Sequence, residues 1–242
     1  VSMLENRDSV SAKMKERLIQ TTTDTGFVFP DSLATIPLHE RGQIGIFMIL
    51  GIGGDKSPNA ELMRLAAQNA REQGFAAEML EVDADLGSDY NAHMLNDMMK
   101  ERMAKYSRIG FVAASKGAAD LITYFYTYGP GVSAADREKV KFVISLSGVI
   151  RSSYIARFLV KSRNVEGILI RNFLRLTGRG ELLDGIRSLA VDPWAGRDIG
   201  GVHSMFPSLR WISFASIPEA ETAITDLSLW AGMLQSPAYQ WL

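Results

Sequence analysis

Short apolar runs alternate along the chain with longer stretches in which apolar residues recur every three or four positions. Residues 44–50 read IGIFMIL, and a continuous apolar run of this length is typical of a strand covered on both faces in a parallel sheet. The amphipathic stretches between such runs predict helices. We therefore expect a doubly wound, mostly parallel α/β sheet of about five strands, at residues 44–50, 75–82, 109–114, 142–146 and 209–217.

Two of the predicted helices carry apolar stripes that we expect to face the sheet. The helix at residues 59–73 would turn Leu62, Met63, Ala66 and Ala70 inward. The helix that starts at Ser88 would bury Tyr90, Met94, Leu95, Met98 and Met103. Spacing of three and four residues places the members of each set on one side of a helix.

The composition suits a soluble globular protein with one domain, residues 1–242. Hydrophobic residues make up 47% and charged residues 22% of the 242 positions, values that are ordinary for such a protein. A net charge of −1 argues against a nucleic-acid-binding protein. No apolar run reaches the length of a transmembrane span. The absence of cysteine fits a reducing compartment such as the cytoplasm, although a secreted protein whose signal peptide has been removed would show the same pattern.

The chemically most informative stretch lies between the predicted strand at 109–114 and the helix after it. It reads Ala113-Ala114-Ser115-Lys116-Gly117, with small residues two positions before and two after the serine. A sharp strand-to-helix turn requires small residues there, because a larger side chain would strike neighbouring backbone. This stretch resembles the nucleophile elbow G-x-S-x-G of the α/β-hydrolases, with Ala113 in place of the first glycine. The alternative is that Ser115 only caps a helix in another kind of α/β domain.

A glycine-rich loop, residues 51–57, follows the first strand and reads GIGGDKS. It is not a P-loop, since Asp55 stands where glycine should precede the lysine, and it lacks the third glycine of a dinucleotide fingerprint. The resemblance implies that this loop supplies one backbone N–H of an oxyanion hole, from Ile52 or Gly53, while Lys116 supplies the other. A plain glycine turn is the alternative, and a nucleotide-binding domain is a more distant one.

The resemblance also implies an acid and a histidine after the serine in the chain. Only His203 follows Ser115, and it precedes the last predicted strand, whereas the family places its histidine beyond that strand. The family's place for the acid corresponds to Glu219 or Glu221, but no histidine follows these residues.

Three explanations stay open for this incomplete set. In the explanation we expect, the protein continues beyond residue 242 with an acid and a histidine. In the second, the fold is catalytically inactive and serves as a binding module. In the third explanation, His203 forms an unusual triad with Asp192, Asp198 or Glu219.

Residues 151–200 differ in character from the rest of the chain. Between Arg151 and Arg187 there are eight basic and three acidic residues, with apolar positions at helical spacing among them. The resemblance implies a helical cap, or lid, whose apolar side covers an acyl group and whose basic side makes transient contact with a membrane or an anionic head group. Ordinary packed helices with solvated arginines are the alternative.

Taken together, the resemblance implies a serine esterase, lipase or thioesterase that acts on a small ester or acyl substrate. Ser115 would attack the carbonyl, and the N–H groups of Lys116 and of Ile52 or Gly53 would stabilise the oxyanion. No metal or organic cofactor is implied. The main alternative is a catalytically inactive α/β-hydrolase-like binding protein.

Overall fold

The computed structural model describes residues 36–54, 58–149, 181–190 and 199–214, together with residues 153, 156, 157, 160 and 172. These residues belong to one compact unit, Ile36–Ala215. The predictions made for residues 1–35 and 215–242, and for most of 151–180, lie outside the described residues.

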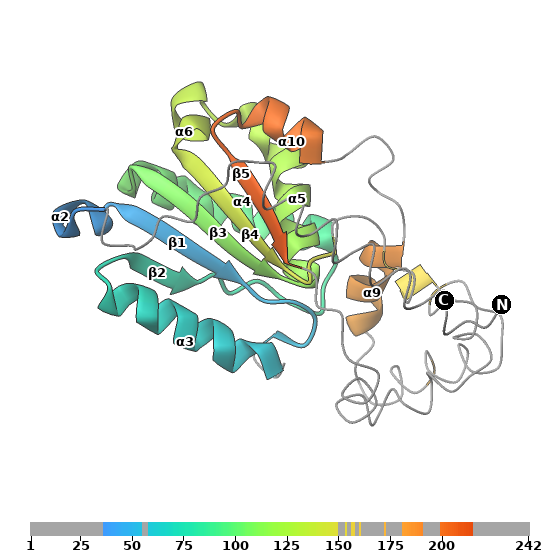
Figure 1. The fold of residues 1–242 in the computed structure, drawn as a ribbon. Helices are drawn as coiled ribbons and strands as arrows, with labels where there is room; N and C mark the ends of the chain where they lie inside the picture. Colours follow the sequence, from blue (N-terminus) through green and yellow to red (C-terminus); the bar gives the residue numbers. More distant parts are fainter. Residues whose placement is uncertain are drawn as a thin grey trace, which may run out of the picture. The chain divides into compact units, whose positions relative to one another are not determined.

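A five-stranded sheet forms the centre of this unit, in the order β2-β1-β3-β4-β5 (Figure 1). Every neighbouring pair of strands is parallel. The strands are β1 (Ile44–Ile49), β2 (Ala76–Met79), β3 (Arg108–Ala114), β4 (Val140–Leu146) and β5 (Arg210–Phe214). The structure thus confirms the predicted parallel sheet, with β2 shorter than expected; residues 215–217 of the last predicted strand lie outside the described residues.

The strand order contains one reversal of direction. After β1 the chain adds β2 on one side, and it then crosses back to place β3 on the other side of β1. In open α/β sheets, ligands bind at such a switch point, in the crevice outside the carboxyl ends of the strands. The carboxyl ends of β1 and β3 are therefore where a site is expected on topology alone.

Helices cover both faces of the sheet. A small apolar cluster places α3 against one face, and a larger one joins α4, α5 and α10 to the other. The described helices are α2 (Leu38–Arg41), α3 (Pro58–Glu72), α4 (Ser88–Lys105), α5 (Lys116–Tyr128), the 3-10 turn η3 (Gly129–Gly131), α6 (Ala134–Lys139), α9 (Leu182–Ala190) and α10 (Ile199–Met205). Of these, α9 and the start of α10 fall in the segment 151–200 that was predicted to be helical.

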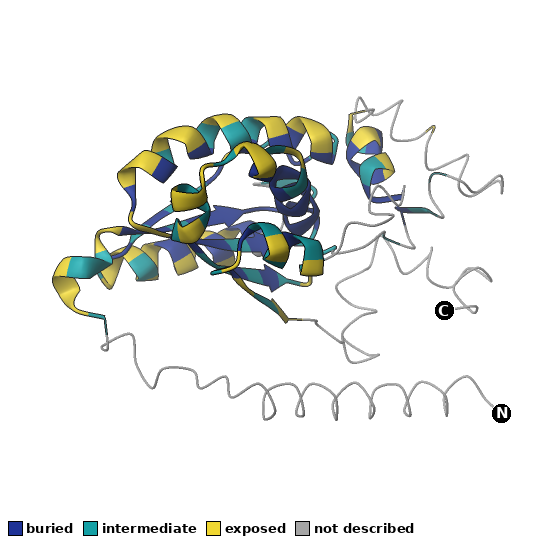
Figure 2. Cartoon of the chain, turned by 90° about the horizontal axis from the view of Figure 1, so that it is seen from above, coloured by how far each residue is buried: buried dark blue, intermediate teal, exposed yellow. Residues whose placement is uncertain are grey.

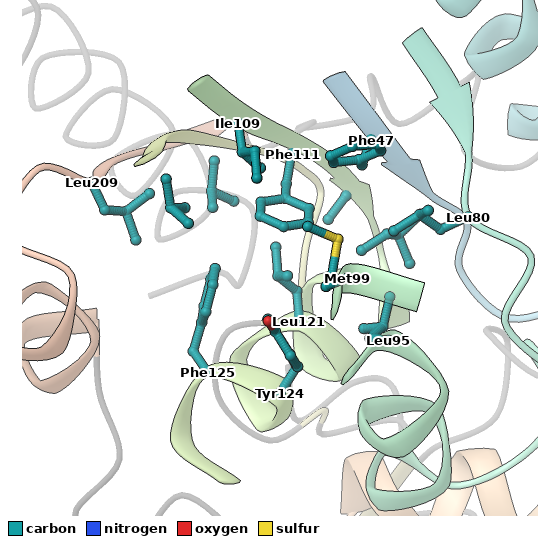
Figure 3. Packing of buried hydrophobic residues seen from close by; sticks show 14 of the residues in the cluster. Phe47, Leu80, Leu95, Met99, Ile109, Phe111, Leu121, Tyr124, Phe125 and Leu209 are labelled. Atoms are coloured by element: carbon teal, nitrogen blue, oxygen red, sulfur yellow. The ribbon is translucent and has the colours of Figure 1, made fainter. Parts of the chain in front are cut away.

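The core lies mainly between the sheet and the pair α4 and α5 (Figures 2 and 3). Phe111 is fully buried in it, with its ring centroid 5.9 Å from that of Phe47 and 5.8 Å from that of Phe125. Ring pairs at these separations add to the free energy gained by burying their apolar surface. The aromatic cluster thus fixes α5 against β1 and β3.

The predicted inward faces of two helices were partly wrong. Leu62 is 65% exposed and Tyr90 is 54% exposed, whereas α3 buries Ala60, Met63 and Ala67. In α4 the polar residues Ser88 and Asn91 are buried instead of Tyr90. Both helices have apolar residues around more than half of their circumference, so spacing alone did not decide which stripe meets the sheet.

Within the described part of the chain, none of the helices combines the length and apolar character that a membrane crossing requires.

The position of Phe111 makes a stability prediction possible. We expect Phe111→Ala to lower the free energy of unfolding by about 3–5 kcal/mol, because it leaves a cavity among packed rings. Leu62→Ala, on the exposed side of α3, should change it by less than about 0.5 kcal/mol. Urea unfolding of both variants measures the difference, and similar losses in the two would contradict this description of the core.

Candidate active site

Ser115 is the single residue between β3, which ends at Ala114, and α5, which begins at Lys116. Its backbone has φ 49° and ψ −118°, a conformation that costs a residue with a side chain on the order of 1–3 kcal/mol. Three backbone hydrogen bonds hold it there. The Ser115 N–H donates to the Leu146 carbonyl at 3.0 Å, and the Ser115 carbonyl accepts from the Val149 N–H at 3.0 Å and from the Ala118 N–H at 3.2 Å.

The corner packs so closely against the end of β1 that two positions require glycine. One is Gly117, two residues after Ser115, and the other is Gly51, just after β1. A Cβ on Gly117 would lie 2.7 Å from the carbonyl oxygens of both Ile49 and Leu50. A Cβ on Gly51 would lie 2.7 Å from the Ser115 Cβ and 3.2 Å from its Oγ. Real Cβ atoms do not approach other atoms so closely, so side chains are excluded at both positions. The small residue predicted at Gly117 is thus required by backbone contact, and Gly51 is a second such position that the sequence analysis did not single out.

The Ser115 hydroxyl does not cap α5, since its side chain makes no cap hydrogen bond to the helix. A capping serine normally has extended backbone and accepts a hydrogen bond from the first turn, and Ser115 has neither property. The interpretation of Ser115 as a plain helix cap is therefore wrong.

The loop after β1 turns back directly beside Ser115. Gly53 and Gly54 both have positive φ, 85° and 47°, which only glycine adopts without strain. The Gly54 N–H donates to the Gly51 carbonyl at 3.1 Å and closes the turn. The two glycine-dependent segments found in the sequence, 51–54 and 113–117, thus meet at the switch point of the sheet.

Backbone N–H groups are available at this place. Among the described residues, nothing accepts a hydrogen bond from the N–H of Lys116 or of Ile52, whereas the Gly53 N–H donates to Asp85 Oδ1 at 3.4 Å. Lys116 is the first residue of α5, and the N-terminus of a helix carries partial positive charge. These groups suit an anion, or an oxygen that acquires negative charge.

The Lys116 side chain points away from this backbone position into the protein interior, with no exposed surface. Its Nζ donates to Asp120 Oδ1 and Oδ2, each at 2.8 Å. The side-chain amide of Asn91 on α4 donates to Asp120 Oδ2, also at 2.8 Å. The sequence analysis missed Asp120 and Asn91; the four-residue spacing of Lys116 and Asp120 was a signal, but Asn91 gave none.

All three histidines of the chain belong to parts of the fold that pack away from Ser115. His39 lies on α2, just before the amino end of β1, while Ser115 follows the carboxyl end of β3. His93 Nδ1 lies 3.1 Å from the hydroxyl of Tyr128, the last residue of α5. Since α5 has 13 residues and begins beside Ser115, its far end is about 20 Å away.

His203 lies on α10, which packs against that same far end of α5. The ring centroid of Phe206, just after α10, is 4.7 Å from that of Phe125. The structure therefore does not bring His203 to Ser115. Its suggested carboxylate partners, Asp192, Asp198 and Glu219, and also Glu221, lie outside the described residues.

A cavity of about 400 Å³, lined by both polar and apolar residues, adjoins the loop after β1. Its lining includes Gly53, Gly54 and Arg64 and the acidic residues Glu81, Asp83 and Asp85. In the part of the chain that the structure describes, no three acidic or histidine side chains gather as a metal site would require.

A strained serine at a strand-to-helix corner, beside a glycine-rich loop at the switch point of a parallel sheet, defines an α/β-hydrolase-like fold. No protein-family model matches the sequence, and no curated protein matches it. Among solved structures, the mature form of a Bacillus licheniformis lipase is similar, with 19% identity and a TM-score of 0.53, over 78% of this chain and 73% of the lipase chain.

The propeptide form of the same lipase also has 19% identity and a TM-score of 0.53, over 70% of this chain and 35% of that one. A metagenomic carboxyl esterase has 21% identity and a TM-score of 0.46, over 74% of this chain and 52% of that one. At these identities the likeness to the lipase concerns the fold, and it confirms the fold that the sequence predicted.

The packing at the corner predicts a difference between two glycines. Gly117→Ala should lower the free energy of unfolding by about 1–3 kcal/mol, because its Cβ meets two backbone carbonyls that cannot rotate away. Gly131→Ala is the matched control, since nothing lies within 4 Å of its added Cβ. Urea unfolding measures the free energy of unfolding of both variants. Equal values for Gly117→Ala and Gly131→Ala would contradict the close contact between Gly117 and the carbonyls of Ile49 and Leu50.

Proposed function

We propose that this protein is a serine hydrolase that cleaves carboxylic esters or thioesters with Ser115 as its nucleophile. The observation that carries the proposal is the strained backbone of Ser115, beside backbone N–H groups that have no acceptor among the described residues. Strain of this kind persists where the surrounding structure enforces it, and it concentrates at functional sites. The fold shared with the Bacillus licheniformis lipase supports the same activity.

In the proposed reaction, Ser115 Oγ attacks the carbonyl carbon of the substrate while a base takes the hydroxyl proton. The carbonyl oxygen becomes an oxyanion, which the N–H groups of Lys116 and of Ile52 or Gly53 stabilise. The base returns its proton to the leaving alcohol or thiol, and an acyl group stays on Ser115. Attack by water, activated by the same base, then releases the carboxylic acid and restores Ser115.

The identity of the base is also part of the proposal. Because all three histidines pack away from Ser115 in the described structure, we assign the base either to a side chain of another type or to a group from outside these 242 residues.

This placement of the histidines favours a second candidate function, a binding protein that holds an ester or acyl compound without cleaving it. Such a protein would use the same crevice and the same N–H groups, which bind a carbonyl or carboxylate oxygen whether or not a base is present.

Residues 151–200 would serve as a cap over this site. The described part that supports this role is α9, which contacts the loop at the carboxyl edge of the sheet. The Gly185 N–H donates to the Asp85 carbonyl at 3.0 Å, and the hydroxyls of Ser188 and Ser88 lie 3.2 Å apart. The apolar residues of the cap would cover an acyl group, and its basic residues would meet an anionic head group or a membrane surface.

The nucleophile is tested with a fluorophosphonate probe, which reacts with activated serines, and with intact mass as the readout. We expect one adduct on the unmodified protein and none on Ser115→Ala, with loss of esterase and thioesterase activity. Ser204→Ala, which removes an exposed serine on α10, should keep both the adduct and the activity. No adduct on the unmodified protein, together with binding of a non-cleavable acyl compound, would establish the second candidate instead.

The position of His203 leads to a separate expectation. His203→Ala should keep the rate of fluorophosphonate labelling within about twofold, because His203 lies on α10, which packs against the end of α5 that is about 20 Å from Ser115. The labelling rate across pH 6 to 9 for both forms measures this. A large loss of labelling in His203→Ala would return this residue to the role of base and would require α10 to move.

A further inference from the structure

We propose that a chain of hydrogen bonds from Lys116 to Gly53 fixes the positions of the two sides of the oxyanion hole, the first turn of α5 and the loop after β1, relative to each other. Asp85 is the residue that positions the loop. By accepting the Gly53 N–H, Asp85 leaves Ile52 as the loop donor to the oxyanion. The inference rests on the proposed function, because the oxyanion hole belongs to that function.

The first part of this chain is buried and charged. In the Lys116–Asp120 pair the two side chains are 0% and 1% exposed. Because a single buried charge without its partner is strongly unfavourable, the pair fixes the first turn of α5 immediately after Ser115. Lys116 therefore has two functions in this proposal, since its backbone N–H faces the site and its side chain anchors the helix.

Asn91 connects this pair to the neighbouring loop. Its side-chain nitrogen donates to Asp120 Oδ2 and to the backbone carbonyl of Asp83, both at 2.8 Å. Both neighbours are acceptors, so the amide nitrogen must face them and the amide cannot turn over. Its Oδ1 has no hydrogen-bond partner among the described residues, which indicates that the two donated bonds dictate the orientation of Asn91.

The second part of the chain leads from Asp83 to the loop after β1. Asp83 Oδ1 accepts the Asp85 N–H at 3.0 Å, and Asp85 Oδ1 accepts the Gly53 N–H at 3.4 Å. The Asp85 carbonyl accepts the Gly185 N–H of α9. The backbone of Asp85 is thus held on both sides, which limits where its carboxylate can lie.

The sequence left open whether the N–H of Ile52 or that of Gly53 donates to the oxyanion, and this arrangement favours Ile52. A carboxylate beside the Gly53 N–H occupies that donor and would repel an oxyanion placed on it. Ile52 immediately follows Gly51, whose backbone packs against Ser115, and the Ile52 N–H has no acceptor among the described residues. Ile52 is therefore the donor on the loop side, opposite the Lys116 N–H.

The experiment compares acidic residues on the wall of one cavity. Asp85→Ala removes the acceptor of the Gly53 N–H, and Asp85→Asn keeps an oxygen that can accept it. Glu81→Ala is the matched control, because Glu81 is exposed, lines the same cavity and loses the same charge. Asp83→Ala tests the preceding link through an exposed residue whose loss leaves the core intact.

The first readout is residue-resolved amide hydrogen exchange, which needs no catalytic activity. We expect exchange at Gly53 to speed up about tenfold in Asp85→Ala, since its N–H loses the side-chain oxygen that accepts it. Asp83→Ala should show a smaller increase, while Asp85→Asn and Glu81→Ala should stay close to the unmodified protein. Equal exchange at Gly53 in Asp85→Ala and Glu81→Ala would overturn the proposal.

The second readout is hydrolysis. Asp85→Ala should lower kcat by about tenfold to a hundredfold with little change in KM, because a misplaced donor weakens stabilisation of the transition state only. Asp85→Asn should restore most of kcat, and an unchanged kcat in Asp85→Ala would overturn the proposal. If the unmodified protein neither hydrolyses esters nor reacts with the probe, the proposed function fails, while exchange at Gly53 still shows whether Asp85 holds the loop.

Discussion

The close packing of backbone around Ser115 is the constraint on which the rest of the structure depends. The first turn of α5 lies so near the end of β1 that a Cβ on Gly117 would meet two carbonyl oxygens. The strained φ of Ser115 is maintained because β3 lies between β1 and β4, and residues after each of these strands contact it. A parallel sheet supplies this support, since the carboxyl ends of its strands meet at one edge. Ser115 and Ser147, which both follow strands at this edge, are the described non-glycine residues with positive φ, so the backbone strain lies where the strands end.

The same topology separates the two ends of the sheet chemically. Backbone N–H groups, glycine turns and acidic side chains gather at the carboxyl ends of β1, β2 and β3. The histidines lie on α2, α4 and α10, in parts that pack near the amino end of β1 or the far end of α5. Because α5 begins beside Ser115 and has 13 residues, residues that contact its last turn lie about 20 Å from the serine. In the described part of the chain, the backbone N–H groups beside Ser115 and the three histidines therefore lie in different parts of the fold.

The buried pair of Lys116 and Asp120 connects stability to this site. Placing two charges in the interior is unfavourable unless both are paired and hydrogen-bonded, and here Asn91 supplies the additional bond from α4. Because Asn91 also holds the Asp83 carbonyl, the loop beside the candidate site depends on contacts between two helices in the core. A polar network therefore lies within an otherwise apolar interface, in the first turns of the helix that follows the strained serine.

The sequence by itself determined the features that depend on neighbouring residues along the chain. Continuous apolar runs defined the strands, and the small residues around Ser115 defined the corner, because strand burial and turn geometry both act within a few residues. Tertiary structure alone decided which stripe of each helix is buried, so Leu62 is exposed while Asn91 is inside. It also decided that Gly53 is engaged by Asp85 and that His203 packs away from Ser115. These outcomes depend on which distant segments meet, and neither the spacing of apolar residues nor a local motif contains that information.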